Sequence, residues 1–270
     1  MKTETFLFFF SLSILIISCT KTTKQNKTIS AYKNTSMIEE TTPLPKKNDS
    51  YYHYSIWWAF VNKVFDADLS VEKLKKNGDI GLGSFNKLDG EMVMVDGIPY
   101  RIREDGSVSE GKDSDTIVYA NAAFFEKNDF FELKTNELDL ITLQSQLLQK
   151  ISSPNFFYVF KIKGKLDYIK CGGLTKQEPP FNKGLDILIP NRPVFEGSHI
   201  SGTLVGFYCP DFIGNINVKG FHFHFISDDK KLGGHVMEFK TSDNLSIEVD
   251  KKSAYHFELP DNQYFKNVSM

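Results

Sequence analysis

Short runs of alternating apolar and polar residues, separated by turn residues, dominate the chain from about residue 78 onwards. Residues 92–95 lead into Asp96-Gly97 and then into residues 100–103, and a second Asp-Gly pair follows at 105–106. Asp-Gly between two short apolar runs is a strong signal for a tight β-hairpin. Further strand-like segments are expected at 117–131, 156–162, 166–170, 203–208, 220–226, 234–240 and 245–249.

Helical patterns are few. Residues 136–151 carry leucines at three- and four-residue spacings, which predicts one amphipathic helix. A shorter helix is expected to begin at Ser70, a good N-cap, and to end before Asn77-Gly78. Pro154 stops the longer helix and predicts a boundary between sheet-rich halves at 51–153 and 154–270. The predicted fold class is therefore α+β, with two sheet-rich halves and few helices.

The N-terminus carries a targeting signal. Lys2 precedes an apolar run over residues 6–17, which is too short to span a hydrocarbon layer of ~30 Å. The segment that ends at Cys19 resembles a bacterial lipobox, in which the cysteine is lipidated. We expect residues 1–19 to be a lipoprotein-type signal peptide and the protein to be extracytoplasmic, lipid-anchored to a bacterial membrane. An ordinary secretion signal with an incidental cysteine is the alternative.

The segment after Cys19 is polar up to about residue 50. It is rich in Lys, Thr, Asn and Ser and has few large apolar residues, so we expect a disordered tether over residues 20–50. Only Cys171 and Cys209 follow it. An oxidising compartment would permit a disulfide between them, and two buried free thiols are the alternative.

Charge argues against a polyanionic partner. The chain has 32 Lys and Arg against 34 Asp and Glu, a formal net charge of −2, and the basic residues are scattered. Nucleic-acid binding would require a concentrated basic face, so no nucleic-acid partner is expected.

Three histidines form the sharpest chemical pattern. His222 and His224 are separated by one residue, and neighbours of that spacing on a strand lie on the same face, ~6.6 Å apart along the backbone. If the turn-rich loop at 228–234 closes a hairpin, His235 returns beside His224. Three imidazoles on one face leave an open position for water or substrate, as in a catalytic zinc site.

Two alternatives to zinc at these histidines stay open. Neutral imidazoles also suit other divalent transition metals, so zinc is a preference. The histidines could also occupy polar sheet positions without a metal. His53, His199 and His256 stand apart in the sequence and are expected to be surface or hydrogen-bonded core residues.

Several separated motifs, in order, resemble the α-acetolactate decarboxylases over about residues 56–265. They are residues 78–91 (GDIGLGSFNKLDGE), 177–179 (QEP), 202–207 (GTLVGF) and the histidine motif with its Gly-Gly-His. The resemblance implies an N-terminal mixed sheet, a C-terminal, mainly antiparallel sheet and a homodimer. It also implies zinc bound by His222, His224 and His235, with Glu91 as the active-site carboxyl group. Ser84 stands at a usual threonine position and is a candidate substrate-binding residue; a hydroxyl that only caps a turn is the alternative.

The activity implied by the resemblance is zinc-dependent decarboxylation of 2-acetolactate, a small hydroxy-keto acid, to acetoin and CO2. Glu91 would deliver the proton to the intermediate, and for that role its pKa should be raised by partial burial while a nearby cation opposes the shift. Two alternatives are a related metalloenzyme that acts on another hydroxy or keto acid and a non-catalytic metal-containing binding lipoprotein.

The sequence departs from the family pattern at two places. The position of the family's active-site arginine falls on Gly172. Lys170, two residues away on the same expected strand face, is the candidate substrate-binding cation in its place, and ordinary solvation at the surface is the alternative. The family's second glutamate, on a C-terminal tail, has no obvious counterpart, and Glu258 is not a match.

Overall fold

The computed structural model describes residues 49–134 and 137–269. The predicted signal peptide, Cys19 and the tether up to residue 48 lie outside the described residues. All described residues belong to one compact unit. Within these residues no helix has the length and apolar character needed to cross a membrane. The tether was predicted to extend to residue 50, whereas the first strand already begins at Ser50.

The first sheet has the strand order β15-β1-β7-β3-β4-β5-β6, and the short β2 pairs with β7. β1 and β15 run parallel, while the other neighbours are antiparallel, so the predicted mixed sheet is confirmed. Its strands are β1 (Ser50–Tyr54), β2 (Leu69–Ser70), β3 (Ile80–Phe85), β4 (Glu91–Val95), β5 (Ile98–Ile102), β6 (Val108–Glu110), β7 (Thr116–Ala123) and β15 (Ala254–Glu258).

The second sheet has the order β8-β14-β10-β11-β12-β13-β9, and β13 also pairs with β10. Its pairings are antiparallel, as predicted. Its strands are β8 (Asp129–Leu133), β9 (Leu138–Asp139), β10 (Phe157–Gly172), β11 (Val194–Cys209), β12 (Gly220–Ser227), β13 (Gly233–Thr241) and β14 (Leu245–Lys252). With the additional β10–β13 pairing, β10, β11, β12 and β13 form a closed cycle of hydrogen-bonded neighbours.

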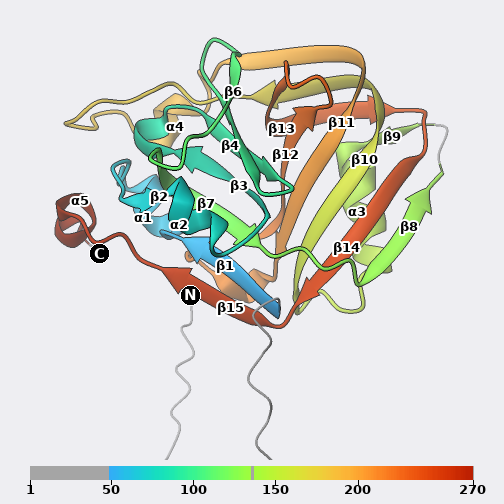
Figure 1. Cartoon of the computed structure of the whole chain (residues 1–270), viewed down its shortest axis with the longest axis horizontal. Coiled ribbons are helices and arrows are strands. Elements are labelled where there is room, and N and C mark those ends of the chain that lie inside the picture. The colour runs from blue at the N-terminus through green and yellow to red at the C-terminus, as the bar shows by residue number, and fades with distance from the viewer. Residues whose placement is uncertain (1–48, 135–136, 270) are drawn as a thin grey trace, which may run out of the picture. The chain divides into compact units, whose positions relative to one another are not determined.

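The predicted boundary at residues 153/154 does not separate the two sheets. β8 and β9 precede the boundary but pair with β14 and β13 of the second sheet, and β15 returns to pair with β1 of the first (Figure 1). Pairing with a strand from the other half satisfies backbone groups that an open sheet edge would leave exposed. The two halves of the sequence are therefore interwoven at the sheet edges.

The described α-helices are short, and the longest, α3, has 11 residues. They are α1 (Trp57–Val61), α2 (Val71–Lys75), α3 (Leu140–Lys150), α4 (Leu185–Leu188) and α5 (Gln263–Asn267). Ser70 caps α2 as predicted, because its side chain accepts a hydrogen bond from the Lys73 N–H at 3.2 Å.

The amphipathic helix begins later than the predicted residue 136, which lies outside the described residues. Asp139 ends β9 and accepts a hydrogen bond from the Thr142 N–H at 2.8 Å, so α3 starts at Leu140. An aspartate in this capping position satisfies a free N–H of the first turn. α3 lies against the second sheet (Figure 1). Its residues Leu143 and Leu147 are buried among the apolar residues of that sheet.

A shared apolar core joins the two sheets. Leu82 and Val93 of the first sheet belong to one buried cluster with Val205, Phe207 and Ile226 of the second. The faces of β3 and β4 therefore pack toward those of β11 and β12. Polar residues on these inner faces are brought into a common interior.

Candidate metal centre and its cavity

The predicted hairpin that carries the histidines is confirmed. β12 and β13 pair so that His224 lies directly opposite His235. Between the strands, the hydroxyl of Ser227 donates to Asp229 at 2.7 Å and accepts the Leu232 N–H at 3.0 Å. These local bonds close the turn and fix the strand register, which places His235 beside the His222–His224 pair.

The three imidazole rings gather at one point. Their centroids are 4.9 Å apart for His222 and His224, 5.0 Å for His222 and His235, and 5.4 Å for His224 and His235. One ring nitrogen from each residue lies within 4.8 Å of the others. This is a group of potential ligand atoms that could hold one metal ion.

Hydrogen bonding orients His224 for this role. Its Nδ1 lies 2.8 Å from the carbonyl oxygen of Met92. Because a carbonyl can only accept, Nδ1 carries the proton and Nε2 keeps its lone pair. Nε2 faces the carboxyl group of Glu91, with Oε2 3.9 Å away. In His222, Nδ1 is buried without a hydrogen-bond partner in the described part of the chain.

Burial also sets the protonation of the rings. It lowers the pKa of His222 to about 4, and the positive charge of Arg192 contributes to the shift. The pKa values of His224 and His235 are lowered for the same main reason. All three imidazoles are therefore neutral near pH 7, which is the form that binds metals. The burial and spacing of the three rings, and the tautomer of His224, fit a metal site.

Glu91 is the carboxylic acid side chain beside the histidines. It opens β4 directly opposite Ser84 of β3 and is 4% exposed. Burial raises its pKa to about 8, while the charge of Arg192 acts in the opposite direction. The raised pKa agrees with the sequence prediction in direction, but burial is almost complete, and the opposing cation in the structure is an arginine.

A cavity of about 350 Å³ opens between the two sheets at these residues. Its polar wall holds the three histidines with Glu91, Ser84 and Arg192, and aromatic and aliphatic side chains form the remainder. The other lining residues are Trp57, Phe60, Gly83, Tyr119, Leu174, Leu185, Ile189, Val218 and Phe221. A mostly apolar pocket with a few convergent polar groups is typical of a small-molecule site.

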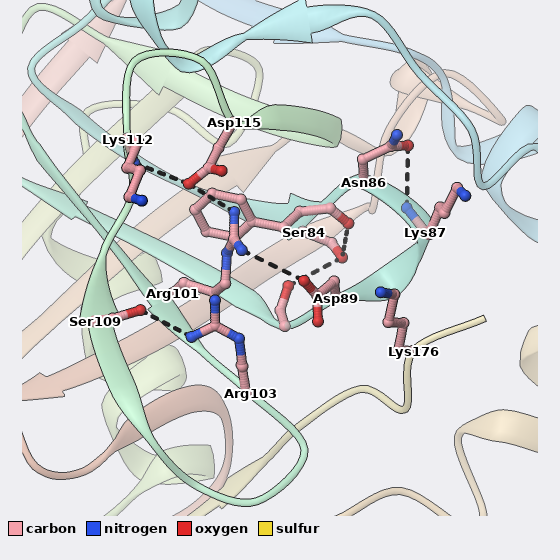
Figure 2. Close-up of polar contacts among 12 residues, drawn as sticks. Ser84, Asn86, Lys87, Asp89, Arg101, Arg103, Ser109, Lys112, Asp115 and Lys176 are labelled. Carbon is pink, nitrogen blue, oxygen red and sulfur yellow. Dashed lines mark hydrogen bonds and ion pairs between the residues drawn. The ribbon is translucent and has the colours of Figure 1, made fainter. Parts of the chain in front are cut away.

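The turn before Glu91 is held by a buried arginine. Figure 2 shows Arg101 between Asp89 and Asp115. Its Nη1 lies 3.3 Å from Asp89 Oδ2, and its Nη2 lies 2.8 Å from Asp115 Oδ2. Its guanidinium carbon also lies 3.9 Å from the centre of the Phe85 ring. Fixing the turn on both sides fixes the start of β4, and therefore the position of Glu91.

Comparison with known proteins decides the family of the chain. A model of the family described as alpha-acetolactate decarboxylase matches residues 51–270. The chain belongs to the α-acetolactate decarboxylase family. It is 31% identical to the alpha-acetolactate decarboxylase of Bacillus licheniformis over 86% of this chain and 91% of that protein. It is 34% identical to the Methanosarcina mazei enzyme of the same name, over 88% and 82% of the two chains.

A solved structure from the α-acetolactate decarboxylase family has the same fold. The alpha-acetolactate decarboxylase of Bacillus subtilis superposes with a TM-score of 0.78 at 27% identity, covering 82% of this chain and 93% of that one. The predicted α+β fold with two sheets is thereby confirmed.

The serine predicted from the α-acetolactate decarboxylase pattern lies in the cavity wall. Ser84 is 2% exposed, and its hydroxyl lies 3.2 and 3.3 Å from the carbonyl oxygens of Phe85 and Gly90 (Figure 2). These bonds stabilise the turn before Glu91. A role for Ser84 in binding substrate stays a prediction.

Lys170, the candidate cation chosen from strand spacing, is not brought to the cavity. Lys170 lies 3.9 Å from Glu196 on the neighbouring strand and is not among the described residues that line the cavity. Arg192 takes that place, and the sequence prediction missed it. One signal could have indicated it, since Arg192 is one of only three arginines in the whole sequence, beside Arg101 and Arg103.

Other polar candidates have structural partners. Glu258 does not line the cavity and accepts a hydrogen bond from Tyr52 at 2.9 Å. His53 is buried, with Nδ1 2.7 Å from the Tyr255 hydroxyl, whereas His199 and His256 are exposed, as expected of surface or core histidines.

The cysteine alternatives are also decided. Cys171 and Cys209 are both buried free thiols, so no disulfide joins them. The thiol of Cys209 donates a hydrogen bond to the Tyr51 hydroxyl at 3.3 Å.

Proposed function

We propose that this protein is a zinc-dependent decarboxylase that converts 2-acetolactate to acetoin and CO2. The observation that carries the proposal is the convergence of three neutral imidazoles beside a buried carboxyl group in one cavity. Family membership supports it, because related proteins in two other organisms bear the name alpha-acetolactate decarboxylase.

His222, His224 and His235 would hold the metal. A bound zinc ion supplies Lewis acidity, which stabilises negative charge as it develops on the oxygens of the substrate. Three protein ligands leave a coordination position open, the arrangement expected of a catalytic site. The His224–Met92 hydrogen bond keeps one ligand in the required tautomer.

Glu91 donates the proton to the intermediate. In the reaction the bond between the carboxyl carbon and C2 breaks, CO2 leaves, and the electron pair passes into an enediolate. A proton must then add to C2 to give acetoin. Burial keeps Glu91 largely protonated near neutral pH, since its pKa is raised to about 8, so it can act as the general acid.

The apolar wall protects the reaction. Trp57, Phe60 and Phe221 lie on the cavity surface together with Glu91. Apolar side chains at this place restrict water, which strengthens electrostatic interactions inside the site and limits stray protonation of the carbanion-like intermediate.

The proposal is tested with purified full-length protein, first treated with a chelator and then reloaded with zinc. Racemic acetolactate is added, and CO2 and acetoin are measured. We expect turnover in the zinc-loaded protein and little in the stripped protein. Zinc binding without any acetoin formation would contradict decarboxylation of acetolactate and would favour a binding protein or an enzyme for another hydroxy or keto acid.

We also propose that the protein is extracytoplasmic and lipid-anchored to a bacterial membrane through Cys19. The support is the short apolar segment before Cys19 in the sequence. In cell fractionation the wild type is expected in the membrane fraction and Cys19→Ser in the soluble fraction. A Cys19→Ser protein that stays in the membrane fraction would contradict lipidation at this residue.

Assembly as a homodimer is a further proposal that comes from the family resemblance. Light scattering of the purified protein should give about twice the mass of one chain. A mass of one chain at micromolar concentration would contradict it.

A further inference from the structure

A single arginine reaches the cavity from a loop between α4 and β11. Arg192 is the one permanently charged side chain among the described residues that line the cavity. Its side chain is only 11% exposed. A guanidinium this far buried needs partners of opposite charge or good hydrogen-bond acceptors.

The protein's own groups satisfy this guanidinium only in part. Nε donates to the carbonyl oxygen of Gly173 at 3.2 Å. One terminal nitrogen lies 3.5 Å from Glu91 Oε1, well beyond the 2.7–2.9 Å that is usual for a charge-assisted hydrogen bond. Arg192 is therefore loosely paired with Glu91, which leaves donor capacity for an anion in the cavity.

The end of β10 is shaped to admit this side chain. A Cβ atom at Gly172 would lie 2.8 Å from Cδ and Nε of Arg192 and 2.9 Å from Cζ. The loop is also fixed there by its backbone, because the Gly173 N–H donates to the Pro193 carbonyl at 2.8 Å. The glycine at the position of the family arginine thus provides the space that Arg192 fills from another part of the chain.

We propose that Arg192 is the substrate-binding residue that holds the carboxylate of the substrate in this cavity, and that Gly172 makes room for it. The inference rests on the function proposed above, because that function supplies an anionic hydroxy-keto acid. An arginine presents a planar fork of donors that matches a carboxylate in two parallel hydrogen bonds. The histidines are neutral ligands, so Arg192 is the protein's own source of positive charge for this anion.

The test measures binding rather than turnover. The probe is 2-hydroxy-2-methylpropanoate, which keeps the hydroxyl and carboxylate groups but has no ketone and is not decarboxylated by this route. Its methyl ester, which lacks the charge, is the matched comparison. Affinities for zinc-loaded full-length protein are measured by calorimetry, and zinc content is measured for every variant.

We expect Arg192→Ala to weaken binding of the carboxylate by about 10- to 100-fold and to leave binding of the ester within about 2-fold, because only the charged hydrogen bonds are lost. Arg192→Lys should keep part of the preference for the carboxylate and Arg192→Gln should lose it, which separates charge from shape. Arg103→Ala removes an arginine outside the cavity, one that donates to Ser109, and should bind both probes as the wild type does.

Moving the arginine gives a second comparison. In the double variant Arg192→Ala with Gly172→Arg, the side chain starts from β10 and points to the same space, so we expect the preference for the carboxylate to return. Unchanged carboxylate affinity in both Arg192→Ala and Arg192→Gln would overturn the proposal. An equal loss of ester and carboxylate binding in both would overturn it too, since that result indicates a structural role.

Failure of this inference is distinct from failure of the proposed function. A protein that binds the carboxylate through Arg192 but leaves acetolactate intact would contradict decarboxylation and support the role of Arg192. A protein that releases acetoin while Arg192→Ala keeps full carboxylate affinity would do the reverse.

Discussion

At the scale of single residues, burial tunes the acid and the metal ligands in opposite directions. It disfavours the charged form of every group, so it raises the pKa of Glu91 and lowers the pKa of His222. The result is a neutral carboxyl group beside neutral imidazoles. This state combines a proton donor with ligands that are ready for a metal.

Glu91→Gln tests the proton donor. The amide keeps the shape of the side chain but cannot deliver a proton, so turnover of acetolactate should fall by about 10²- to 10⁴-fold. Zinc content should match that of the wild type, because Glu91 is not one of the three ligands. Rates similar to the wild type in steady-state assays would remove Glu91 from the mechanism.

His53 predicts a pH dependence of stability that is independent of the metal site. It is fully buried, and burial lowers its pKa to about 3 from an ordinary 6.5. Below pH 6.5 the unfolded chain binds a proton that the folded chain does not. The contribution of neutral His53 to the unfolding free energy is therefore complete above pH 6.5 and is lost progressively as the pH falls toward 3. Tyr119 and Tyr255 pack against the ring and stay neutral over this range.

His53→Gln should remove this contribution. Between pH 7.5 and pH 5 the unfolding free energy of the wild type should fall by about 2 kcal/mol more than that of the variant, since about 1.4 kcal/mol is lost per pH unit below 6.5. Urea unfolding of both zinc-loaded proteins at the two pH values measures the difference. Equal losses would show that His53 is not held neutral by the fold.

At the scale of elements, the hairpins are the part that the sequence predicts well. Asp96 and Gly97 both have positive φ, 53° and 78°, as a tight turn between β4 and β5 requires. The alternation of β12 likewise predicted that His222 and His224 share a face. Turn chemistry and period-two patterning act over a few residues, so one sequence is enough to detect them.

Gly234 lies in β13 directly before the candidate metal ligand His235 and packs closely against β10. Its φ is +127°, and a Cβ there would lie 2.7 Å from the carbonyl oxygen of Gly172. Gly234→Ala should cost about 1–3 kcal/mol of stability and weaken zinc binding by at least about 10-fold, because His235 follows directly and must shift with β13. Unfolding and zinc titrations measure the two effects.

Gly97→Ala is the matched control for that change. Gly97 also has a positive φ, but an added Cβ would meet nothing within 4 Å. We expect a loss of about 1 kcal/mol and unchanged zinc affinity. If Gly234→Ala also binds zinc like the wild type, the contact with Gly172 does not position His235.

At the scale of the whole molecule, the sequence could not give the pairings between distant segments. β1 and β15 pair in parallel although about 200 residues separate Tyr52 from its partner His256. Such a pairing depends on the packing of both sheets and leaves no local pattern. For the same reason the division at 153/154 did not follow the sheets.

The composition of the cavity is a property of the whole molecule as well. The three histidines and Glu91 were found from local motifs and family resemblance, whereas Arg192 comes from a loop whose position depends on its packing against Gly172 and Gly173. Spacing along the strand pointed to Lys170 instead. Strand periodicity could not indicate Arg192, because it carries no information about a loop that packs against the end of the strand.

The central claim is that His222, His224 and His235 together hold one metal ion. The direct measurement is calorimetric titration of zinc into the stripped full-length protein and into the His235→Ala variant. We expect one tight site per wild-type chain and an affinity at least about 100-fold weaker in the variant, since one of three ligands is lost. Equal zinc affinity and stoichiometry in the two proteins would contradict it.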